Sequence, residues 1–339
     1  MTPQLEVPDQ ASFASEPGEP ASIVVEEPTA GESAAARRSA ELTLFMVVAI
    51  WSVNSLMVKW VVGEVPPIVF ATARYAISFA VLLGVLRWRE GSVGLPRREI
   101  LPLAALGMAG FGIYQDLWTT ALSHTTASNS ALITAAAPIW TMVVATAIGA
   151  DMLTRGKLLG TAVALGGTAM VVGATHGFSV AGASAGDLMT LLATVGWGGY
   201  VALGAPLLTR LSPLRLTTWS MGFGILGMVP IAAWQLPGLE PDKVGPGVIA
   251  VLLYSSVLGA SLANVALIGT TRALGPTRTM SFLFLIPALV VVGAAIFLNE
   301  SIVPGQVLGG VLVVVGILVT RSHRLHVPVR GEERSRAAG

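Results

Sequence analysis

Two stretches of this sequence repeat one pattern: residues 138–167, PIWTMVVATAIGADMLTRGKLLGTAVALGG, and residues 287–316, PALVVVGAAIFLNESIVPGQVLGGVLVVVG. Each stretch begins with a proline, reaches an acidic residue after an apolar run, and continues into spaced glycines. The second copy lies 149 residues after the first. The matched positions are Pro138 and Pro287, Asp151 and Glu300, Gly156 and Gly305, Gly160 and Gly309, and Gly167 and Gly316.

The same offset extends beyond these stretches. It also pairs Gly110 with Gly259 and Gln115 with Asn264. Because the chain contains 38 glycines, one matched glycine means little, but a series of matches in register is hard to attribute to chance. We therefore interpret the chain as two copies of one unit.

The composition indicates a protein of the lipid bilayer. Of the 339 residues, 53% are hydrophobic and 12% are charged, and the mean hydropathy is +0.74. Such a chain is too apolar for a water-soluble globular protein of this length. The sequence has no cysteine, which excludes disulfides and thiolate metal sites.

The apolar stretches predict an all-α integral membrane protein with ten transmembrane helices. A hydrocarbon core of about 30 Å needs about 20 helical residues, and unpaired backbone groups are not tolerated against lipid. We divide the helices equally between a first repeat, residues 41–175, and a second repeat, residues 186–320. The expected spans are 42–62, 66–87, 100–122, 128–149, 157–175, 187–208, 214–235, 247–270, 277–298 and 303–320.

Polar tails flank the two repeats. Residues 1–40 are rich in glutamate and proline, a composition that cannot bury enough apolar surface to offset the entropy lost on ordering. We expect this segment to be a disordered cytoplasmic tail, with a docking segment as the alternative. It has neither the basic start nor the apolar stretch of a signal peptide. Residues 321–339 form a basic tail, also expected in the cytoplasm.

The positions of the basic residues predict the orientation. The Lys and Arg residues fall on one side of the expected helices, whereas the other side has only Lys243 beside several carboxylates. By the positive-inside rule the basic side is cytoplasmic, and both termini lie there. The residues on this side are Arg37, Arg38, Arg87, Arg89, Arg97, Arg98, Arg155, Lys157, Arg210, Arg215, Arg272, Arg278, Arg321, Arg324, Arg330, Arg334 and Arg336.

An odd number of helices in each repeat has a topological consequence. The second repeat must enter the membrane upside down relative to the first, which puts Asp151 at a cytoplasmic turn and Glu300 at an external one. Inverted repeats place a substrate site between the halves near the middle of the bilayer, and rocking of one half against the other gives alternating access. The repeat therefore points to transport.

The residues resemble a known family. Ala131-Leu132 before Pro138, the acid-to-glycine run after it, and the sequences Leu298-Asn299-Glu300 and Gly305-Gln306-Val307-Leu308-Gly309-Gly310 are similar to the EamA family of the drug/metabolite transporter superfamily. Trp51, Asn54, Lys59 and Arg74 also resemble its pattern. The resemblance covers about residues 42–320 and implies a carrier of the bacterial inner membrane, many members exporting amino acids or other small metabolites. The residue before the family's proline is often acidic, and here it is Ala137 or Ile286.

Three ionisable residues inside the expected helices stand out. Charged groups in a bilayer usually face a cavity or a partner, so Lys59, Arg74 and Asp116 are candidates for a substrate site. If all three face one cavity, two cations and one carboxylate leave a charge of +1, which favours a ligand with a carboxylate or other anionic group. The alternatives are snorkelling of Lys59 to the interface and a structural ion pair between Arg74 and Asp116.

Neutral polar and aromatic side chains complete the expected cavity. Their amides, hydroxyls and rings can surround a ligand, although the same groups also hold neighbouring helices together. Trp51 and Trp197 occupy corresponding places at an offset of 146, whereas Trp118 and Trp219 look more like interface anchors. The remaining candidates are Asn54, Tyr114, Gln115, Asn129, Tyr200 and Asn264.

Matched prolines and glycines suggest moving and packing elements. Pro138 and Pro287 are hinge candidates, because each lies inside an expected helix and frees the carbonyl four residues back; packing irregularity is the alternative. The spaced glycines form faces of small residues that let the fifth and tenth expected helices pack closely.

The sequence predicts a carrier. It leaves open a non-transporting receptor or assembly protein and, with less support, an intramembrane enzyme. The four histidines lack the spacing of a metal hydrolase, so we expect no enzyme, no metal and no cofactor. A non-transporting receptor or assembly protein is the main alternative. The expected partners are the lipid bilayer and a small-molecule substrate, without nucleic acid. Substrate identity, direction of flux, proton coupling and formation of a homodimer are not decided by the sequence.

Overall fold

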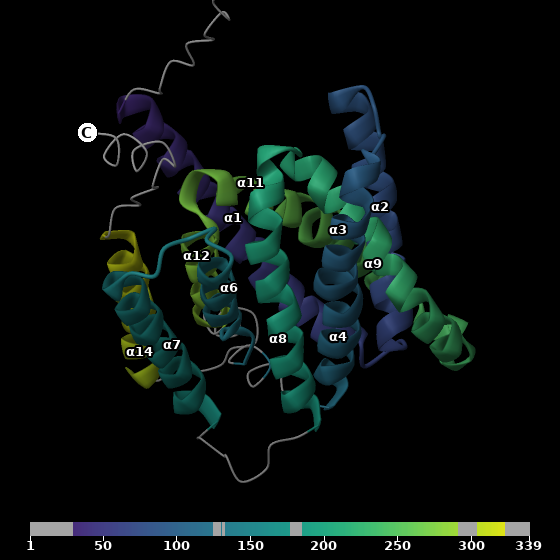
Figure 1. The fold of residues 1–339 in the computed structure, drawn as a ribbon. Helices are drawn as coiled ribbons and strands as arrows, with labels where there is room; N and C mark the ends of the chain where they lie inside the picture. The colour runs from purple at the N-terminus through teal and green to yellow at the C-terminus, as the bar shows by residue number, and fades with distance from the viewer. Residues whose placement is uncertain (1–29, 125–129, 131–132, 177–184, 291–303, 323–339) are drawn as a thin grey trace, which may run out of the picture.

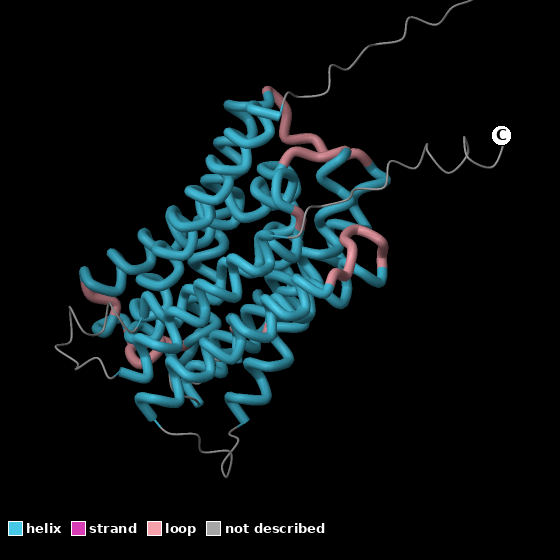
Figure 2. Tube along the Cα trace, turned by 90° about the vertical axis from the view of Figure 1, so that its left-hand side faces the viewer, coloured by secondary structure: helices cyan, strands magenta, loops and turns pink. Residues whose placement is uncertain are grey.

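The structure is a computed structural model that describes residues 30–124, 130, 133–176, 185–290 and 304–322. These residues form a bundle of helices packed side by side, with connections at the two ends of the bundle (Figures 1 and 2). Most of both predicted tails lies outside the described residues, and so do Asn129 and Glu300.

The first half begins with two long helices, and its third rod is a continuous helix with a π-helical centre. Its elements are α1 (Ala30–Val61), α2 (Pro67–Glu90), α3 (Arg97–Gly107), the π-helix η1 (Met108–Ile113), α4 (Tyr114–His124), α6 (Ala137–Ala147) and α7 (Arg155–His176).

The second half follows the same order, and its third rod again has a π-helical centre. Its elements are α8 (Ala185–Gly204), the 3-10 helix η2 (Ala205–Thr209), α9 (Pro213–Gln235), the 3-10 turns η3 (Leu236–Gly238) and η4 (Pro241–Lys243), α10 (Pro246–Tyr254), the π-helix η5 (Ser255–Leu262), α11 (Ala263–Leu274), α12 (Pro276–Ser281), the 3-10 turn η6 (Phe282–Phe284) and α14 (Pro304–Ser322).

The lengths of these rods fit a membrane protein. Six helices of the described part are long and apolar enough to cross a bilayer by length and composition. The segments Ala137–Ala147, Pro276–Val290 and Val307–Thr320 are apolar but shorter. The prediction of an all-helical membrane protein is thus confirmed, while the number ten stays a prediction. The six long helices span Ala34–Val61, Pro67–Glu90, Arg97–His124, Ala185–Thr209, Pro213–Gly238 and Pro246–Leu274.

The first helix starts earlier than expected. α1 begins at Ala30, within the segment 1–40 that we predicted to be a disordered tail, and before the expected start at residue 42. Alanine has the highest helix propensity of all residues, and the run from Ala34 to Ala36 supplies it here. The described end of the tail is therefore helical.

Local sequence signals fix the ends of α2 and α9. Pro67 and Pro213 occupy first-turn positions, where the missing N–H would be unpaired in any case. Ser212 caps α9 by accepting a hydrogen bond from the Arg215 backbone N–H at 3.0 Å. Gly91 ends α2 with a positive φ of 68°, a conformation that glycine adopts without steric cost.

The spaced glycines bring α7 and α14 into direct backbone contact. A Cβ atom added at Gly160 would lie 2.6 Å from the Gly316 carbonyl oxygen, and one added at Gly167 would lie 2.6 Å from the Gly309 carbonyl oxygen. The repeat pairs Gly160 with Gly309 and Gly167 with Gly316, so each of the two contacts is the repeat equivalent of the other. The predicted close packing of these helices is confirmed.

The other contacts between the halves also occur in matched pairs. Gly259 in η5 packs against Asn54 of α1, and Gly110 in η1 packs against Tyr200 of α8. Gly110 and Gly259 are repeat partners, and Asn54 and Tyr200 share the offset of 146 that relates Trp51 to Trp197. The first helix of each half therefore packs against the π-helical third rod of the other half.

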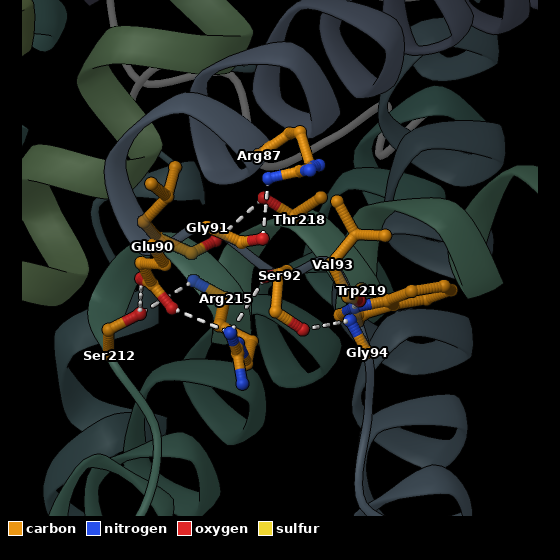
Figure 3. A network of polar contacts seen from close by, with 11 residues as sticks. Arg87, Glu90, Gly91, Ser92, Val93, Gly94, Ser212, Arg215, Thr218 and Trp219 are labelled. Carbon is orange, nitrogen blue, oxygen red and sulfur yellow. Dashed lines mark hydrogen bonds and ion pairs between the residues drawn. The ribbon is translucent and has the colours of Figure 1, made fainter.

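Polar contacts tie the halves together at the end of the bundle that is uppermost in Figure 1. Arg215 of α9 forms an ion pair with Glu90 of α2 at 2.9 Å and donates to the Ser92 carbonyl at 2.9 Å (Figure 3). Ser212 donates to Glu90, and Trp219 Nε1 donates to the Val93 carbonyl at 3.0 Å.

Two more ion pairs cross between the halves at this end. Arg278 of α12 contacts Glu41 of α1 at 2.6 Å, and Arg210 after η2 contacts the buried Glu99 of α3 at 3.4 Å. At the opposite end the described residues contain the pair Lys243 with Glu240, which joins two residues of the second half. The end with the crossing ion pairs is the one where the basic residues gather.

Candidate functional site

A cavity of about 110 Å³ lies between the two halves. Its walls come from α1, α2, α4 and the residues around Thr134 in the first half, and from α8, η5, α11 and the segment before Pro287 in the second. A space of this size holds several water molecules or a small ligand. The predicted site residues among its lining are Trp51, Asn54, Arg74, Tyr114, Gln115, Trp197, Asn264 and Pro287.

Arg74 is the charged residue of this lining. Its side chain is 2% exposed, and its Nη2 donates to Gln115 Oε1 at 2.7 Å. Gln115 Nε2 in turn donates to the Tyr75 hydroxyl at 2.7 Å, while the guanidinium lies 4.8 Å from the Tyr75 ring centroid. Amide and aromatic groups therefore orient the cation, and its Nε has no hydrogen-bond partner in the described structure.

Arg74 has no ion pair with a carboxylate among the described residues. Asp116 follows Gln115 by one residue, and one residue turns a helix by about 100°, so the two side chains leave α4 in different directions. Asp116 lies outside the cavity lining, is half-buried, and has a buried Oδ1 without a hydrogen-bond partner among the described residues. The alternative of a structural Arg74–Asp116 pair thus does not occur in this structure.

Aromatic rings form one wall of the cavity. Trp51 meets Trp197 edge to face with ring centroids 5.7 Å apart. Tyr114 stacks on Trp197 at 5.2 Å and on Trp118 at 6.3 Å. The two tryptophans that the repeat relates therefore touch each other across the boundary between the halves. Such a wall offers a ligand a large apolar contact area.

Trp118 corrects one sequence interpretation. We expected an interface anchor, but the side chain is buried and lines the cavity. It lies four residues after Tyr114 and three after Gln115 on α4, so the helical period places all three on one face. That spacing was the signal that could have identified Trp118 from the sequence. Further lining residues that we had not predicted include Ser55, Tyr75, Leu122, Ser130, Thr134 and Ile286.

The π-helix η5 exposes backbone carbonyls that side chains then satisfy. Trp51 Nε1 donates to the Gly259 carbonyl at 2.9 Å, and Ser78 of α2 donates to the Ser256 carbonyl at 2.6 Å. Ser255 donates to Asn54 Oδ1 at 2.5 Å. A π-helical turn breaks the regular ladder of hydrogen bonds and frequently marks a functional site. Here it directs groups of the second half toward residues of the first.

Gln115 and Asn264, which the repeat pairs, both line the cavity. Each follows the π-helix of its own half, Gln115 in α4 and Asn264 in α11. Asn264 Nδ2 donates to the Ala260 carbonyl at 2.8 Å, and its buried Oδ1 has no partner in the described part of the chain. The cavity thus has a donor-rich side at Arg74 and an amide acceptor at Asn264.

The remaining predicted residues lie elsewhere. Lys59 is outside the lining, and its Nζ donates to the Leu122 carbonyl at 2.6 Å. Tyr200 is fully buried behind Trp197, with ring centroids 5.3 Å apart. Asn129 is outside the described residues, although Ser130 beside it lines the cavity.

The two hinge candidates occupy different local structures. Pro138 lies in the first turn of α6, after a turn at Ala135 and Ala136, so the chain breaks its helix there and the proline starts a new one. The expected continuous helix 128–149 with a kink is therefore interrupted. Pro287 lies within a helical segment preceded by the 3-10 turn η6, where proline removes the backbone bond to Leu283.

Membrane-length helices in two similar halves, around a cavity lined by a buried cation, are the features of a multi-pass membrane protein with a central cavity. The model of the EamA-like transporter family matches residues 38–173 and 184–322. The chain belongs to this family, and the resemblance noted in its sequence is confirmed.

Similar proteins carry transporter names. The chain is 26% identical to "Uncharacterized transporter YyaM" of Bacillus subtilis, over 80% of this chain and 90% of that protein. It is 26% identical to "Probable terminal-alkyne amino-acid exporter" of Streptantibioticus cattleyicolor, over 82% and 94%, and 23% identical to "Probable amino-acid metabolite efflux pump" of Salmonella typhimurium, over 81% and 92%. These names indicate a transporter and not an enzyme.

A solved structure shares the fold. It superimposes on the chain with a TM-score of 0.66 at 21% sequence identity, covering 83% of this chain and 95% of the other. The likeness shows that the arrangement of helices is one that a natural protein adopts, and it extends through both halves.

Proposed function

We propose that the protein is a cell-membrane carrier that exports or exchanges a small carboxylate-bearing metabolite, such as an amino acid or a related compound. The observation that carries this proposal is the buried Arg74, held by Gln115 against a cavity and without a carboxylate ion pair in the described structure. A buried cation is stable only with compensation, and a ligand carboxylate would supply it. Two relatives support the same class of cargo, one named a probable terminal-alkyne amino-acid exporter and the other a probable amino-acid metabolite efflux pump.

The shape of the site supports two contacts with such a cargo. Arg74 would hold the carboxylate, and the wall of Trp51, Tyr114 and Trp197 would contact an apolar portion. Asn264 Oδ1 would accept a hydrogen bond from an amino or hydroxyl group. The site would therefore select a compact molecule that has one anionic end.

The mechanism we propose is alternating access between inverted repeats. In Figure 1, α1 starts at the upper end of the bundle and α8 starts at the lower end, as an inverted second repeat requires. The exchanged contacts of Gly110 with Tyr200 and Gly259 with Asn54 fit a twofold relation between the halves. Rocking about the central site would then open it to one face at a time.

This structure would represent the outward-facing state. The cavity extends to Trp118 and Leu122 near the lower end of α4, away from the basic residues. Three ion pairs join the halves at the opposite, basic end, which would be the closed end. By the positive-inside rule that end would be cytoplasmic, with both termini on its side.

Metabolite release from overexpressing cells tests the proposal. We expect mass spectrometry of the medium to show one or a few carboxylates accumulating with the wild type, and Arg74→Gln to lower the initial rate about ten- to a hundredfold. That range corresponds to about 1.5–3 kcal/mol for a charge-assisted hydrogen bond. Lys243→Gln is the matched control, since Lys243 is an exposed cation outside the cavity lining and pairs with Glu240.

Reconstituted liposomes separate the candidate classes. A carrier gives saturable uptake and exchange of the compound identified in cells, whereas a receptor or assembly protein binds it without flux. An enzyme would consume it. Equal release by wild type and Arg74→Gln, at equal amounts of inserted protein, would remove Arg74 from the site.

A further inference from the structure

We propose that Arg74 binds a small inorganic anion, with chloride as the physiological ligand, whenever no cargo is present. Arg74 is buried and lines the cavity, and its counter-charge is not found among the described residues. Chloride binding goes beyond the proposed transport function and does not depend on what the cargo is.

The need for an anion follows from the burial of the charge. An unpaired ion in a low-dielectric interior is strongly destabilising, and buried charges in proteins are paired or coordinated. The amide dipole of Gln115 and the quadrupole of the Tyr75 ring both interact with Arg74. They orient the guanidinium, but neither group carries a net negative charge. A diffusible anion in the cavity would complete the neutralisation.

The unpaired groups of the cavity favour an anion over a cation. Arg74 Nε, Ser130 Oγ and Thr134 Oγ1 are buried, belong to residues of the lining, and have no hydrogen-bond partner in the described part of the chain. An N–H can only donate, and a hydroxyl can donate to an anion. The unpaired acceptor of the same lining is Asn264 Oδ1. The excess of donors is what a chloride or a carboxylate needs.

Chloride and a cargo carboxylate would compete for the same donors. Binding of cargo would then release chloride, and loss of cargo would let chloride return, so the empty carrier would never expose a bare buried cation. This link between chloride and cargo rests on the proposed function. Chloride binding itself is measured without cargo, so the two can fail separately.

Thermal unfolding of the purified full-length protein in detergent tests the proposal. Sodium chloride is exchanged for the sodium salt of the buffer MES at constant ionic strength, because the MES anion is a bulky sulfonate without a carboxylate and so is no analogue of the proposed cargo. A ligand that binds only the folded state raises the unfolding midpoint with concentration. We expect a saturable rise with chloride and with acetate, which would use the same donors, and no rise with MES.

Two variants locate the effect. Arg74→Gln removes the cation, and we expect it to abolish the chloride response. Gln115→Glu keeps the shape of the side chain and supplies an internal carboxylate at the position that already contacts Arg74 at 2.7 Å. This variant should fold and should also lose the chloride response. It therefore keeps the test decisive if Arg74→Gln fails to fold.

Three results would overturn the proposal. The first is a wild-type midpoint that is the same in chloride and in MES, which would mean that water alone solvates Arg74. The second is an unchanged chloride response in Gln115→Glu, which would place the anion elsewhere. The third is a linear response without saturation, the behaviour of a general salt effect. The Lys243→Gln control should retain the full response.

Discussion

At the scale of single residues, the cavity is built by side chains that satisfy backbone groups of the opposite half. Trp51 donates its indole N–H to the Gly259 carbonyl, and Ser78 donates to the Ser256 carbonyl. Both acceptors lie in η5, where the π-helical turn interrupts the normal ladder. Trp51 therefore has two functions: its ring forms the cavity wall and its nitrogen holds η5 in place.

Trp51→Phe separates these two functions. The substitution keeps an aromatic ring but, among side-chain donors of the described residues, leaves the Gly259 carbonyl with only the long hydrogen bond from Asn264 Nδ2 at 3.4 Å, so we expect a loss of about 1 kcal/mol in stability. A lower unfolding midpoint in detergent would register it. Trp88→Phe is the control, because Trp88 is 78% exposed and should leave the midpoint unchanged. Equal midpoints for the two variants would show that the indole hydrogen bond adds nothing.

The sequence predicted which residues line the cavity better than it predicted which of their side chains contact one another. The sequence identified Arg74, Gln115 and Asn264 as members of one cavity, because polar groups in apolar helices have few other places to go. It did not show that Gln115 and not Asp116 meets Arg74. Which of these two side chains faces Arg74 depends on how α4 is rotated about its axis. The π-helix η1, which immediately precedes α4, changes this rotation. A one-dimensional pattern of apolar residues does not record such a rotation.

At the scale of helices, glycine faces bring α7 and α14 into close backbone contact. Backbone atoms approach so closely that a methyl group at Gly167 would lie 2.6 Å from the Gly309 carbonyl oxygen. Without a hydrophobic driving force in lipid, such small-residue faces let helices gain van der Waals contact. The spaced glycines made this packing predictable from the sequence, whereas the π-helices had no comparable signal.

Neighbouring glycines on α7 provide a matched test of this interface. Gly167→Ala forces α7 and α14 apart, and overpacking of this kind costs about 1–3 kcal/mol. Gly166→Ala meets no atom within 4 Å and removes a flexible residue from a helix, so it should be neutral or stabilising. We expect a lower unfolding midpoint for the first variant only. Similar losses in both would mean that helix flexibility, and not close packing, explains the glycines.

At the scale of the whole molecule, the two ends of the bundle are held differently. Ion pairs between the halves gather at the basic end, among them Glu90 with Arg215 and Glu41 with Arg278. Each pair would have to break if the halves rock apart at this end. In the alternating-access mechanism proposed above, the pairs would favour the state in which the cavity extends toward the other end.

A charge exchange tests this bias. Glu90→Arg should replace attraction by repulsion and shift the balance toward the inward-facing state, about fivefold for a change of about 1 kcal/mol. Adding Arg215→Glu should restore it. Because the sequence has no cysteine, a Ser55→Cys reporter in the cavity can be labelled selectively from outside with a membrane-impermeant maleimide.

Slower labelling in Glu90→Arg, with recovery in the double variant, is the expected result. Unchanged labelling in all variants would mean that this ion pair does not bias the equilibrium. Faster labelling in Glu90→Arg would reverse the assignment of the closed end. The control is Lys243→Gln, which removes a cation that pairs within one half.

The packing of the first helix of each half against the third rod of the other half has a consequence for biosynthesis. The ribosome completes the amino-terminal half while α8 and η5 do not yet exist, so Ser78 and Asn54 enter the membrane before their hydrogen-bond partners Ser256 and Ser255 are made. The nascent intermediate must wait with its polar groups facing water, lipid headgroups or an insertase. Maturation of this protein thus depends on the last-made helices arriving in time, and a truncated product should be recognised and degraded.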